Sequence, residues 1–421
     1  MKTYARYKDS GISWIGKIPE HWEMKRVASF FDENKETNKN LVYKKAYQFK
    51  YGSLVPKNEI GDEKEYEETY VKYTVLNKND LVFNGLNLNY DFVSQRVAIC
   101  PARGIITSAY IAITPRNTID PMFYCWLFKT MDNKKMFHGM GSGIRLTLSY
   151  AELKTQLIPV PSIEEQKTIA AYLDKKTEQV NGLVAAKQKQ IELLKEYKQS
   201  LIANAVTKGI NPKVKMKDSG INWIGKVPEH WSIHFLFQKA KEHYISNKNI
   251  HHQNLLSLSY GRIIQKDINT TEGLLPESFD TYQIVEDGNI VLRLTDLQND
   301  HKSLRVGYVT QEGIITSAYE CLEVMSGYFP KYLYYQLHSF DIKKMFYGMG
   351  GGLRQNLNYN ELKKIRIAVP PFEEQKVIVE YIENRVSSID SQISSIEKQI
   401  ANLNEYKQSL ISDVVTGKVK V

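Results

Sequence analysis

The sequence predicts an α+β protein in which two similar α/β domains are separated by an antiparallel pair of long coiled-coil helices, a pseudo-twofold tandem repeat. Three observations predict it: an internal repeat that spans the chain, strand-forming runs in the first part of each copy, and a long proline-free stretch in the second part. The repeat decides how every other element is interpreted.

The repeat has one offset, 209 residues, at every place where it can be recognised. KDSGISWIGKIPEHW at 8–22 returns as KDSGINWIGKVPEHW at 217–231, and GIITSAY at 104–110 returns at 313–319. The shorter runs LSYAELK, EEQK and EYKQSLI recur, with small changes, at the same offset. A period this long indicates two copies of a whole domain together with the segment that follows it.

One part of the repeat has diverged. Residues 32–93 and 241–302 share little beyond a Tyr-Gly pair, Tyr51-Gly52 in one copy and Tyr260-Gly261 in the other. Two copies of one fold that each recognise a different target would show this pattern. The alternative is that the amino-acid sequence of surface loops has drifted without a change of function.

The first part of each copy predicts a mixed domain. In the first copy, runs at 80–85, 95–100 and 105–114 are rich in Val, Ile and Phe and end in turn residues, which indicates strands. The stretches 121–131 and 330–340 each begin at a proline and predict short buried helices. The four tryptophans of the repeated opening, Trp14, Trp22, Trp223 and Trp231, are expected to anchor that segment in the core.

The second part of each copy predicts one long helix. In the first copy Ser162 and Glu165 have the spacing of a capping box, and acidic residues suit the first turn of a helix. From Ser162 to Thr207 such a helix would span about 70 Å. The second copy has Pro371 in place of the serine and keeps only the acidic turn.

Apolar residues follow steps of three and four along both helices, which is the pattern of a coiled-coil seam. A single helix that packs on its own domain is the alternative, but two matched narrow seams favour mutual pairing. The short connection after the first helix makes the pairing antiparallel. The predicted helix-pairing residues are Val180, Val184, Ile191, Leu194 and Leu201 in the first helix and Val386, Ile389, Ile393, Ile396, Ile400, Leu403 and Leu410 in the second.

The predicted order of segments follows from these elements. It is domain 1 (1–160), spacer helix 1 (161–208), linker (209–216), domain 2 (217–369), spacer helix 2 (370–416) and tail (417–421).

Composition narrows the class of protein. A chain of 421 residues suggests two or three domains, and its net charge of +9 favours a polyanionic partner. No apolar run is long enough to cross a membrane, the N-terminal stretch lacks the apolar segment of a secretory signal, and the three cysteines show no paired spacing. We therefore expect a cytoplasmic protein without a disulfide framework or zinc site.

No catalytic constellation is visible. The chain lacks the P-loop pattern, has no Pro-Asp pair of the kind found in many nucleases, and its histidines have no ligand spacing. The stretch Val369-Pro370-Pro371-Phe372 resembles a methyltransferase motif but has valine where the target amine would need a polar partner. We interpret it as a helix entry.

A glycine-rich motif recurs as KKMFHGMGSGIR at 134–145 and KKMFYGMGGGLR at 343–354. Glycines allow a backbone to approach a phosphate closely, and flanking cations attract it. A strained turn with solvated lysines is the alternative. The predicted phosphate contacts are Lys134, Lys135, Arg145, Lys343, Lys344 and Arg354.

The diverged segments carry side chains that can read base edges, since amides suit adenine and guanidinium suits guanine. Arg96 has a counterpart in Arg305, so it can instead serve the scaffold or a phosphate. The predicted base-reading residues are Asn84, Asn87, Asn89, Gln95 and Arg96 in the first copy and Arg293, Thr295, Asp296, Gln298 and Asn299 in the second.

The doubled W-I-G-x-x-P-x-H-W opening, the IPVPSIEEQ and VPPFEEQ helix entries and the LKEYKQSLI-type helix ends resemble the specificity subunit of type I restriction–modification systems. The resemblance covers nearly the whole chain. It implies two target-recognition domains, each reading one half of a bipartite asymmetric site in double-stranded DNA, and helices that set the spacing. It also implies two methyltransferase subunits docked on the helices and restriction–translocase subunits in the full complex. S-adenosylmethionine, ATP and magnesium would belong to those partners, and this chain would hold no cofactor or metal.

The sequence leaves two rival interpretations open. A self-contained methyltransferase or nuclease would need a cofactor motif, and none is visible. A structural adaptor with incidental basic charge would bind no DNA.

Overall fold

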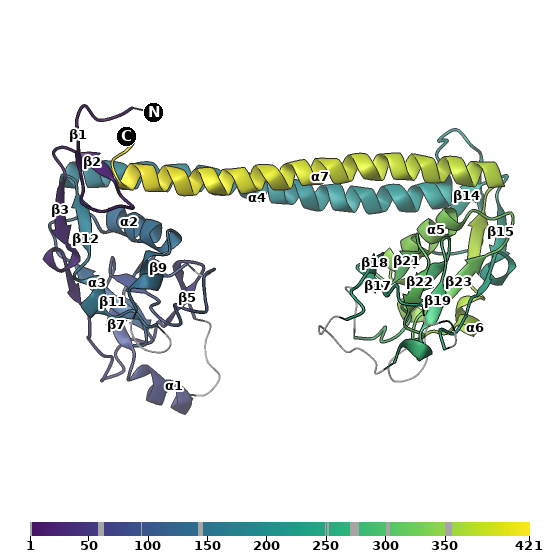
Figure 1. Cartoon of the computed structure of the whole chain (residues 1–421), viewed down its shortest axis with the longest axis horizontal. Coiled ribbons are helices and arrows are strands. Elements are labelled where there is room, and N and C mark those ends of the chain that lie inside the picture. The colour runs from purple at the N-terminus through teal and green to yellow at the C-terminus, as the bar shows by residue number, and fades with distance from the viewer. Residues whose placement is uncertain are drawn as a thin grey trace. The chain divides into compact units, whose positions relative to one another are not determined.

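The computed structural model describes residues 2–57, 63–93, 95–141, 146–248, 250, 252–269, 278–299, 304–349 and 356–421. The chain forms two compact units. Unit 1 consists of Met1–Lys187 and Glu397–Val421, and unit 2 of Gln188–Ile396. Each unit therefore contains one globular domain, the beginning of the long helix that leaves it and the end of the other long helix (Figure 1). The predicted order treats the helices as separate segments, whereas the structure shares both helices between the units.

Unit 1 is built around a four-stranded antiparallel sheet in the order β4-β11-β8-β9, with two-stranded pairs β1–β2, β3–β12, β5–β6 and β7–β10 around it. Helix α2 packs against β9 and the core. The predicted strand at 105–114 is interrupted by a turn and forms two strands, β10 and β11. The elements are β1 (Tyr7–Asp9), β2 (Lys17–Pro19), β3 (Glu23–Arg26), β4 (Phe31–Glu33), β5 (Tyr47–Lys50), β6 (Ser53–Pro56), α1 (Glu63–Tyr70), β7 (Thr74–Leu76), β8 (Leu81–Phe83), β9 (Val97–Ile99), β10 (Gly104–Ile106), β11 (Ile111–Pro115), α2 (Pro121–Asn133), α3 (Tyr150–Leu153) and β12 (Leu157–Val160), with 3₁₀ turns at Val27–Ser29 and Met136–Gly139.

Unit 2 repeats this plan, with a sheet in the order β16-β23-β20-β21 and pairs β13–β14, β15–β24, β17–β18 and β19–β22. Helix α5 takes the place of α2. The elements are β13 (Met216–Asp218), β14 (Lys226–Pro228), β15 (Ser232–Phe235), β16 (Ala240–Glu242), β17 (Leu256–Ser259), β18 (Arg262–Gln265), β19 (Gln283–Val285), β20 (Ile290–Leu292), β21 (Val306–Tyr308), β22 (Gly313–Ile315), β23 (Glu320–Val324), α5 (Pro330–Ile342), α6 (Tyr359–Leu362) and β24 (Arg366–Val369), with 3₁₀ turns at Leu236–Gln238, Phe279–Thr281 and Met345–Gly348.

The repeated opening, residues 8–22 and 217–231, packs against the start of the long helix in each unit. Trp22 and Trp231 are fully buried, and each indole N–H donates to the second glutamate of the helix entry, Glu165 at 3.5 Å and Glu374 at 3.0 Å. The histidine before each tryptophan contacts the same carboxylate. The opening therefore fixes the point where each long helix begins, and the expected core role of these two tryptophans is confirmed.

The glutamine of the EEQ motif ties three elements together. Buried Gln166 donates from Nε2 to the carbonyl of Pro161 and accepts from the backbone N–H of Asp120 at the start of α2. Gln375 makes the matching contacts with Pro370 and Phe329 in unit 2. The predicted capping box is also present, because Ser162 Oγ accepts from the Glu165 backbone N–H at 3.3 Å.

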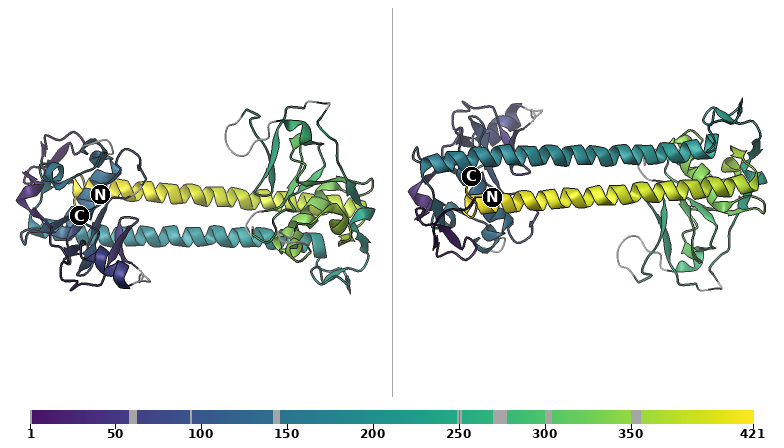
Figure 2. Two further views of the ribbon diagram at one scale, coloured as in Figure 1. Left: turned by 90° about the horizontal axis from the view of Figure 1, so that it is seen from below. Right: turned by 90° about the horizontal axis from the view of Figure 1, so that it is seen from above.

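The long helices α4 (Ile163–Lys208) and α7 (Phe372–Val415) run side by side in opposite directions within each unit (Figures 1 and 2). In unit 1 Lys407 Nζ donates to Asn181 Oδ1 at 2.9 Å, and in unit 2 Lys198 pairs with Asp390 at 2.7 Å. Residue numbers rise along one helix as they fall along the other, so the pairing is antiparallel.

The predicted seam residues are all shielded from solvent to some extent. They divide into a buried group, Val180, Ile191, Leu201, Ile389, Ile393, Ile396 and Leu410, and a half-buried group, Val184, Leu194, Val386, Ile400 and Leu403.

The two ends of the chain meet in unit 1. Lys2 and Lys420 form an isolated antiparallel bridge, and the Tyr7 hydroxyl donates to the carbonyl of Lys418. Figure 2 shows the termini next to each other beside the end of α7. The C-terminal tail thereby packs on the core of unit 1 through half-buried Val419 and Val421, next to the buried end of α7 at Val414 and Val415.

His338 lies on α5 of unit 2, packed against the helix's own Tyr334. Its ring stacks on Tyr334 with centroids 5.6 Å apart, and its buried Nδ1 has no hydrogen-bond partner among the described residues. Burial, assisted by the positive charge of Lys198, lowers the pKa of this imidazole from 6.5 to about 4. The folded chain therefore keeps the ring neutral at pH values where the unfolded chain protonates it.

We expect the free energy of unfolding of unit 2 to fall as the pH drops from 6.5 to about 4, because only the unfolded state binds this proton in that interval. The contribution is fully present above the unfolded pKa, and its loss reaches about 3 kcal/mol near the folded pKa. Replacing His338 by leucine should remove this part of the pH dependence in urea unfolding curves. A His338 signal that titrates near its ordinary pKa in the NMR spectrum of the folded chain would contradict the prediction.

Candidate nucleic-acid interface

Residues 84–93, 95 and 96 of unit 1 lie between β8 and β9, beside the C-terminal end of α2. Residues 293–299, 304 and 305 of unit 2 lie between β20 and β21, in the matching place. A leucine at the same repeat position in each loop, Leu88 or Leu297, is fully buried and anchors the segment. Most of the predicted base-reading residues lie in these two loops.

Arg96 holds the first loop from inside. Its side chain is 1% exposed, and its Nη1 donates to the carbonyls of Asn84 and Leu86 at 3.0 and 2.8 Å. Its Nη2 donates to the carbonyl of Asp91 at 2.7 Å. The guanidinium thus binds the loop backbone through both of its terminal nitrogens. This geometry favours the scaffold role over base readout for Arg96, because no base edge can reach a buried, occupied guanidinium.

Arg305 does the same in unit 2. It is fully buried, and its Nη1 donates to the carbonyls of Arg293 and Thr295 at 3.1 and 2.8 Å. Its Nε donates to the hydroxyl of Tyr347 at 3.1 Å. A loop of different sequence is therefore held by an equivalent arginine. We call Arg96 and Arg305, with the loop carbonyls that they bind, the arginine clamps.

A buried aspartate at the end of each helix supports the clamp. The backbone N–H of Arg96 donates to Asp132 Oδ2 at 2.6 Å, and that of Arg305 to Asp341 Oδ2 at 2.6 Å. Burial raises the pKa of Asp132, although the hydrogen bond from Arg96 and the nearby positive charges oppose the shift. The aspartate orients the backbone that carries the arginine. Its role could not be predicted from the sequence, in which only its place in the repeat is visible.

The glycine-rich motif is partly structural. Lys135 and Lys344 each have a positive φ, +59° and +57°, at the point where α2 and α5 end. Lys135 Nζ donates to the carbonyl of Phe92 in the first loop, and the ring of His138 stacks on that of Phe92 at 4.7 Å. Part of this motif therefore braces the loop.

The other predicted phosphate contacts have different surroundings. Lys134 and Lys343 are exposed, and Lys343 Nζ donates to the carbonyl of Trp223 at 3.1 Å. Burial lowers the pKa of Lys343, and Lys208 adds to this effect. Arg145 and Arg354 lie outside the described residues. Among the described candidates, Lys134 and Lys343 are therefore exposed, whereas Lys135 and Lys344 are half-buried.

The remaining predicted base readers lie on the loops with varied exposure. Asn87, Gln95, Gln298 and Asn299 are exposed, whereas Asn84, Asn89, Arg293, Thr295 and Asp296 are half-buried. Sequence reasoning missed the apolar tip of the first loop, where Val93 is 91% and Tyr90 75% exposed. It also missed the hairpins β5–β6 and β17–β18, which lie beside the loops.

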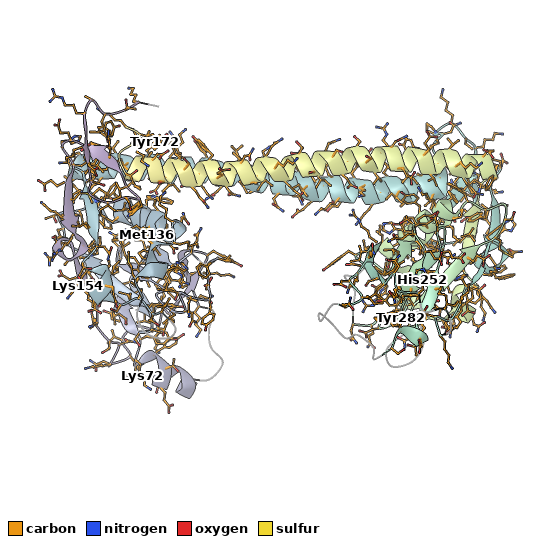
Figure 3. The ribbon with its side chains drawn as sticks, in the orientation of Figure 1. Lys72, Met136, Lys154, Tyr172, His252 and Tyr282 are labelled. Carbon is orange, nitrogen blue, oxygen red and sulfur yellow. The ribbon has the colours of Figure 1, made fainter. Side chains whose placement is uncertain are left out.

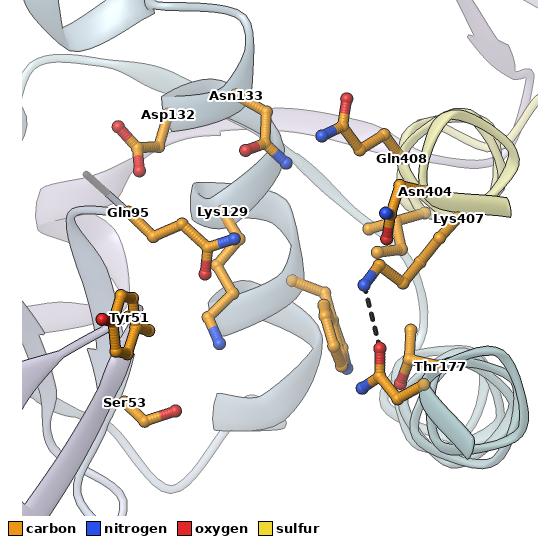
Figure 4. A pocket seen from close by; sticks show the side chains of 13 residues that line it. Tyr51, Ser53, Gln95, Lys129, Asp132, Asn133, Thr177, Asn404, Lys407 and Gln408 are labelled. Atoms are coloured by element: carbon orange, nitrogen blue, oxygen red, sulfur yellow. Dashed lines mark hydrogen bonds between the residues drawn. The ribbon is translucent and has the colours of Figure 1, made fainter. Parts of the chain in front are cut away.

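A hollow of about 300 Å³ opens in unit 1 between the β5–β6 hairpin, α2 and the paired helices (Figure 4). Tyr51, Ser53 and Gln95 line it on one side, and Lys407, hydrogen-bonded to Asn181, on the other. Burial lowers the pKa of Lys407. The lining of this hollow is mainly polar.

The described residues include no cluster of three or more His, Cys, Asp or Glu side chains that could hold a metal ion.

Comparison with known proteins points to one family. The family model described as the type I restriction modification DNA specificity domain matches residues 19–193 and 283–405. The putative type I restriction enzyme MjaX specificity subunit of Methanocaldococcus jannaschii is 24% identical over 441 residues, covering 97% of this chain and 96% of its own. The MjaVIII specificity subunit of the same organism is 24% identical over 430 residues, covering 96% and 94%.

Solved structures share the fold. One, from work on complex assembly and conformational transition of the type I R-M system, superposes with a TM-score of 0.72 at 13% identity and covers 96% of this chain and 99% of its own. The HsdS subunit from Thermoanaerobacter tengcongensis superposes with a TM-score of 0.55 at 15% identity, covering 96% and 98%. No helix among the described residues has the length and apolar character needed to cross a bilayer.

Proposed function

Because the chain belongs to the family of type I restriction modification DNA specificity domains, we propose that it selects the DNA site of a type I restriction–modification complex, with each unit reading one half of a bipartite asymmetric site. The chain contributes recognition and no catalysis of its own. S-adenosylmethionine, ATP and magnesium belong to partner subunits, and the complex works in the cytoplasm.

The observation that carries this proposal is that equivalent buried arginines hold two loops whose exposed side chains differ. Arg96 and Arg305 hold backbone carbonyls at matched positions, 84 and 86 in one unit and 293 and 295 in the other. The exposed side chains of the two loops differ at matched positions, for example Tyr90 against Asn299. Direct readout needs such differences, because each base pair presents its own donor and acceptor pattern in the major groove.

The long helices supply a surface for the partners. Outside the seam they expose apolar side chains, among them Leu193 at 52% and Tyr197 at 56% in α4 and Tyr406 at 45% in α7. Tyr197 and Tyr406 are matched by the 209-residue offset. This supports the docking of two methyltransferase subunits, one on each copy of the repeated surface, with restriction–translocase subunits joining the full complex.

The test is methylome sequencing of cells that carry this chain with its methyltransferase subunit. We expect methylation at one interrupted site with two unlike halves, lost when this chain is deleted. Methylation that persists without the chain would contradict the proposal. An isolated chain that binds labelled S-adenosylmethionine saturably would support a self-contained methyltransferase.

A further inference from the structure

The hairpins β5–β6 and β17–β18 share a geometry that their sequences do not suggest. Both turn through a Tyr-Gly pair with positive φ at both residues, +50° and +70° at Tyr51-Gly52 and +47° and +75° at Tyr260-Gly261. These values belong to a two-residue type I′ turn, in which the first position is strained for a bulky aromatic residue. The turn is kept in both copies although the surrounding segments have diverged.

One face of each hairpin is anchored. Tyr47 and Leu54 are buried in a small core of unit 1, and Leu256 with half-buried Ile263 packs in the matching core of unit 2. The tip of the hairpin in unit 1 also lies against the loop that Arg96 holds. A side chain at Gly52 would come within 2.4 Å of the amide oxygen of Gln95, the neighbour of Arg96 in the sequence. The hairpin and this loop are therefore adjacent parts of one surface of unit 1.

The other face of each hairpin carries three polar side chains beside one aliphatic residue, Val55 in unit 1 and Ile264 in unit 2, and there the copies differ. In unit 1, Gln48, Lys50 and Ser53 are exposed, with Lys50 and Ser53 directly opposite each other on the two strands. In unit 2 the matching residues are Ser257, Ser259 and Arg262, with Arg262 exposed and opposite Ser259. All three positions change between the copies while the register is kept.

We propose that the two hairpins are the ribbons that read base edges in the DNA major groove, and that Arg262 reads a guanine. The proposal rests on the proposed function and names the element that performs it. A major groove admits a two-stranded ribbon, and bidentate guanidinium contact with the O6 and N7 atoms of guanine is the commonest specific contact. Gln48 and Lys50 give the first ribbon an amide for adenine and an ammonium for guanine. Tyr51 and Tyr260, 85% and 84% exposed at the tips, flank the read bases.

The test exchanges outer-face residues and leaves the anchored faces unchanged. Arg262→Ser should make one guanine position degenerate in the half-site of unit 2, raising methylation of sites with another base there about tenfold or more, as expected for a lost bidentate contact. The half-site of unit 1 should stay unchanged. The triple variant Gln48→Ser, Lys50→Ser, Ser53→Arg should alter the half-site of unit 1 and leave that of unit 2 unchanged.

Methylome sequencing in cells with the methyltransferase subunit reports both halves at once. Lys72→Ser is the matched control, since it removes an exposed charge from unit 1 away from the hairpin and should leave the site unchanged (Figure 3). A wild-type chain that directs no bipartite methylation would reject the proposed function. A normal wild-type site that both variants leave unaltered, or methylation weakened equally at all sequences, would reject the ribbons as base readers and leave the proposed function intact. Single variants at Gln48 and Ser53 keep the test decisive if the triple variant fails to fold.

Discussion

Replacing Arg96 by methionine is expected to lower the free energy of unfolding of unit 1 by roughly 3–5 kcal/mol, because the carbonyls of Asn84, Leu86 and Asp91 lose their buried donors. Methionine fills most of the volume, so the loss reports the polar contacts more than a cavity. Asp132 would also lose a neighbouring positive charge that favours its ionised form. The loop at 84–96 would then lose its fixed conformation, and the half-site read by unit 1 should become degenerate.

The matched control is Arg103→Met. Its side chain is 53% exposed and faces Glu36 at 4.0 Å, so its removal should cost less than about 1 kcal/mol. Chemical denaturation of both variants, followed by methylation sequencing, separates the two cases. If Arg96→Met were as stable as Arg103→Met, the clamp would not hold the loop.

The second large effect is expected at the helix seam. Ile396 is 6% exposed, and burying such a side chain is worth roughly 2–5 kcal/mol relative to alanine. Ile396→Asp adds the desolvation of a carboxylate to that loss. The paired helices should loosen, and the docking of methyltransferase subunits should weaken before either globular domain unfolds.

Ser394→Asp places the same charge on an exposed position of the same helix and serves as the control. Thermal unfolding and co-purification with the methyltransferase subunit are the measurements. Equal behaviour of the two variants would show that the seam does not depend on Ile396.

The repeat explains why so much of the fold could be predicted. Trp22 and Trp231 occupy equivalent buried places because each donates to the equivalent glutamate, Glu165 or Glu374, and a doubled motif makes such a contact visible in one sequence. The seam was visible because apolar steps of three and four report which face of a helix is covered.

The candidate site was harder to predict, for reasons that particular residues show. Arg96 has the chemistry of a base reader, and only its burial assigns it to the backbone. Lys135 has the chemistry of a phosphate contact but bonds to the carbonyl of Phe92. The hairpin turn was hidden because Tyr-Gly lacks the Asn-Gly or Asp-Gly signature of a type I′ turn. Local sequence gives a side chain's chemistry, whereas the fold decides which groups remain accessible.

One exchange tests the central claim, that each unit reads its own half-site through its diverged segment, most directly. Residues 241–309 replace residues 32–100, a segment of equal length that ends at buried positions in both copies, Cys100 and Val309. Methylome sequencing of cells that carry this chimera with the methyltransferase subunit should reveal a site in which the half-site of unit 2 occurs twice and that of unit 1 has disappeared. A folded, active chimera that still methylates the original asymmetric site would contradict the account.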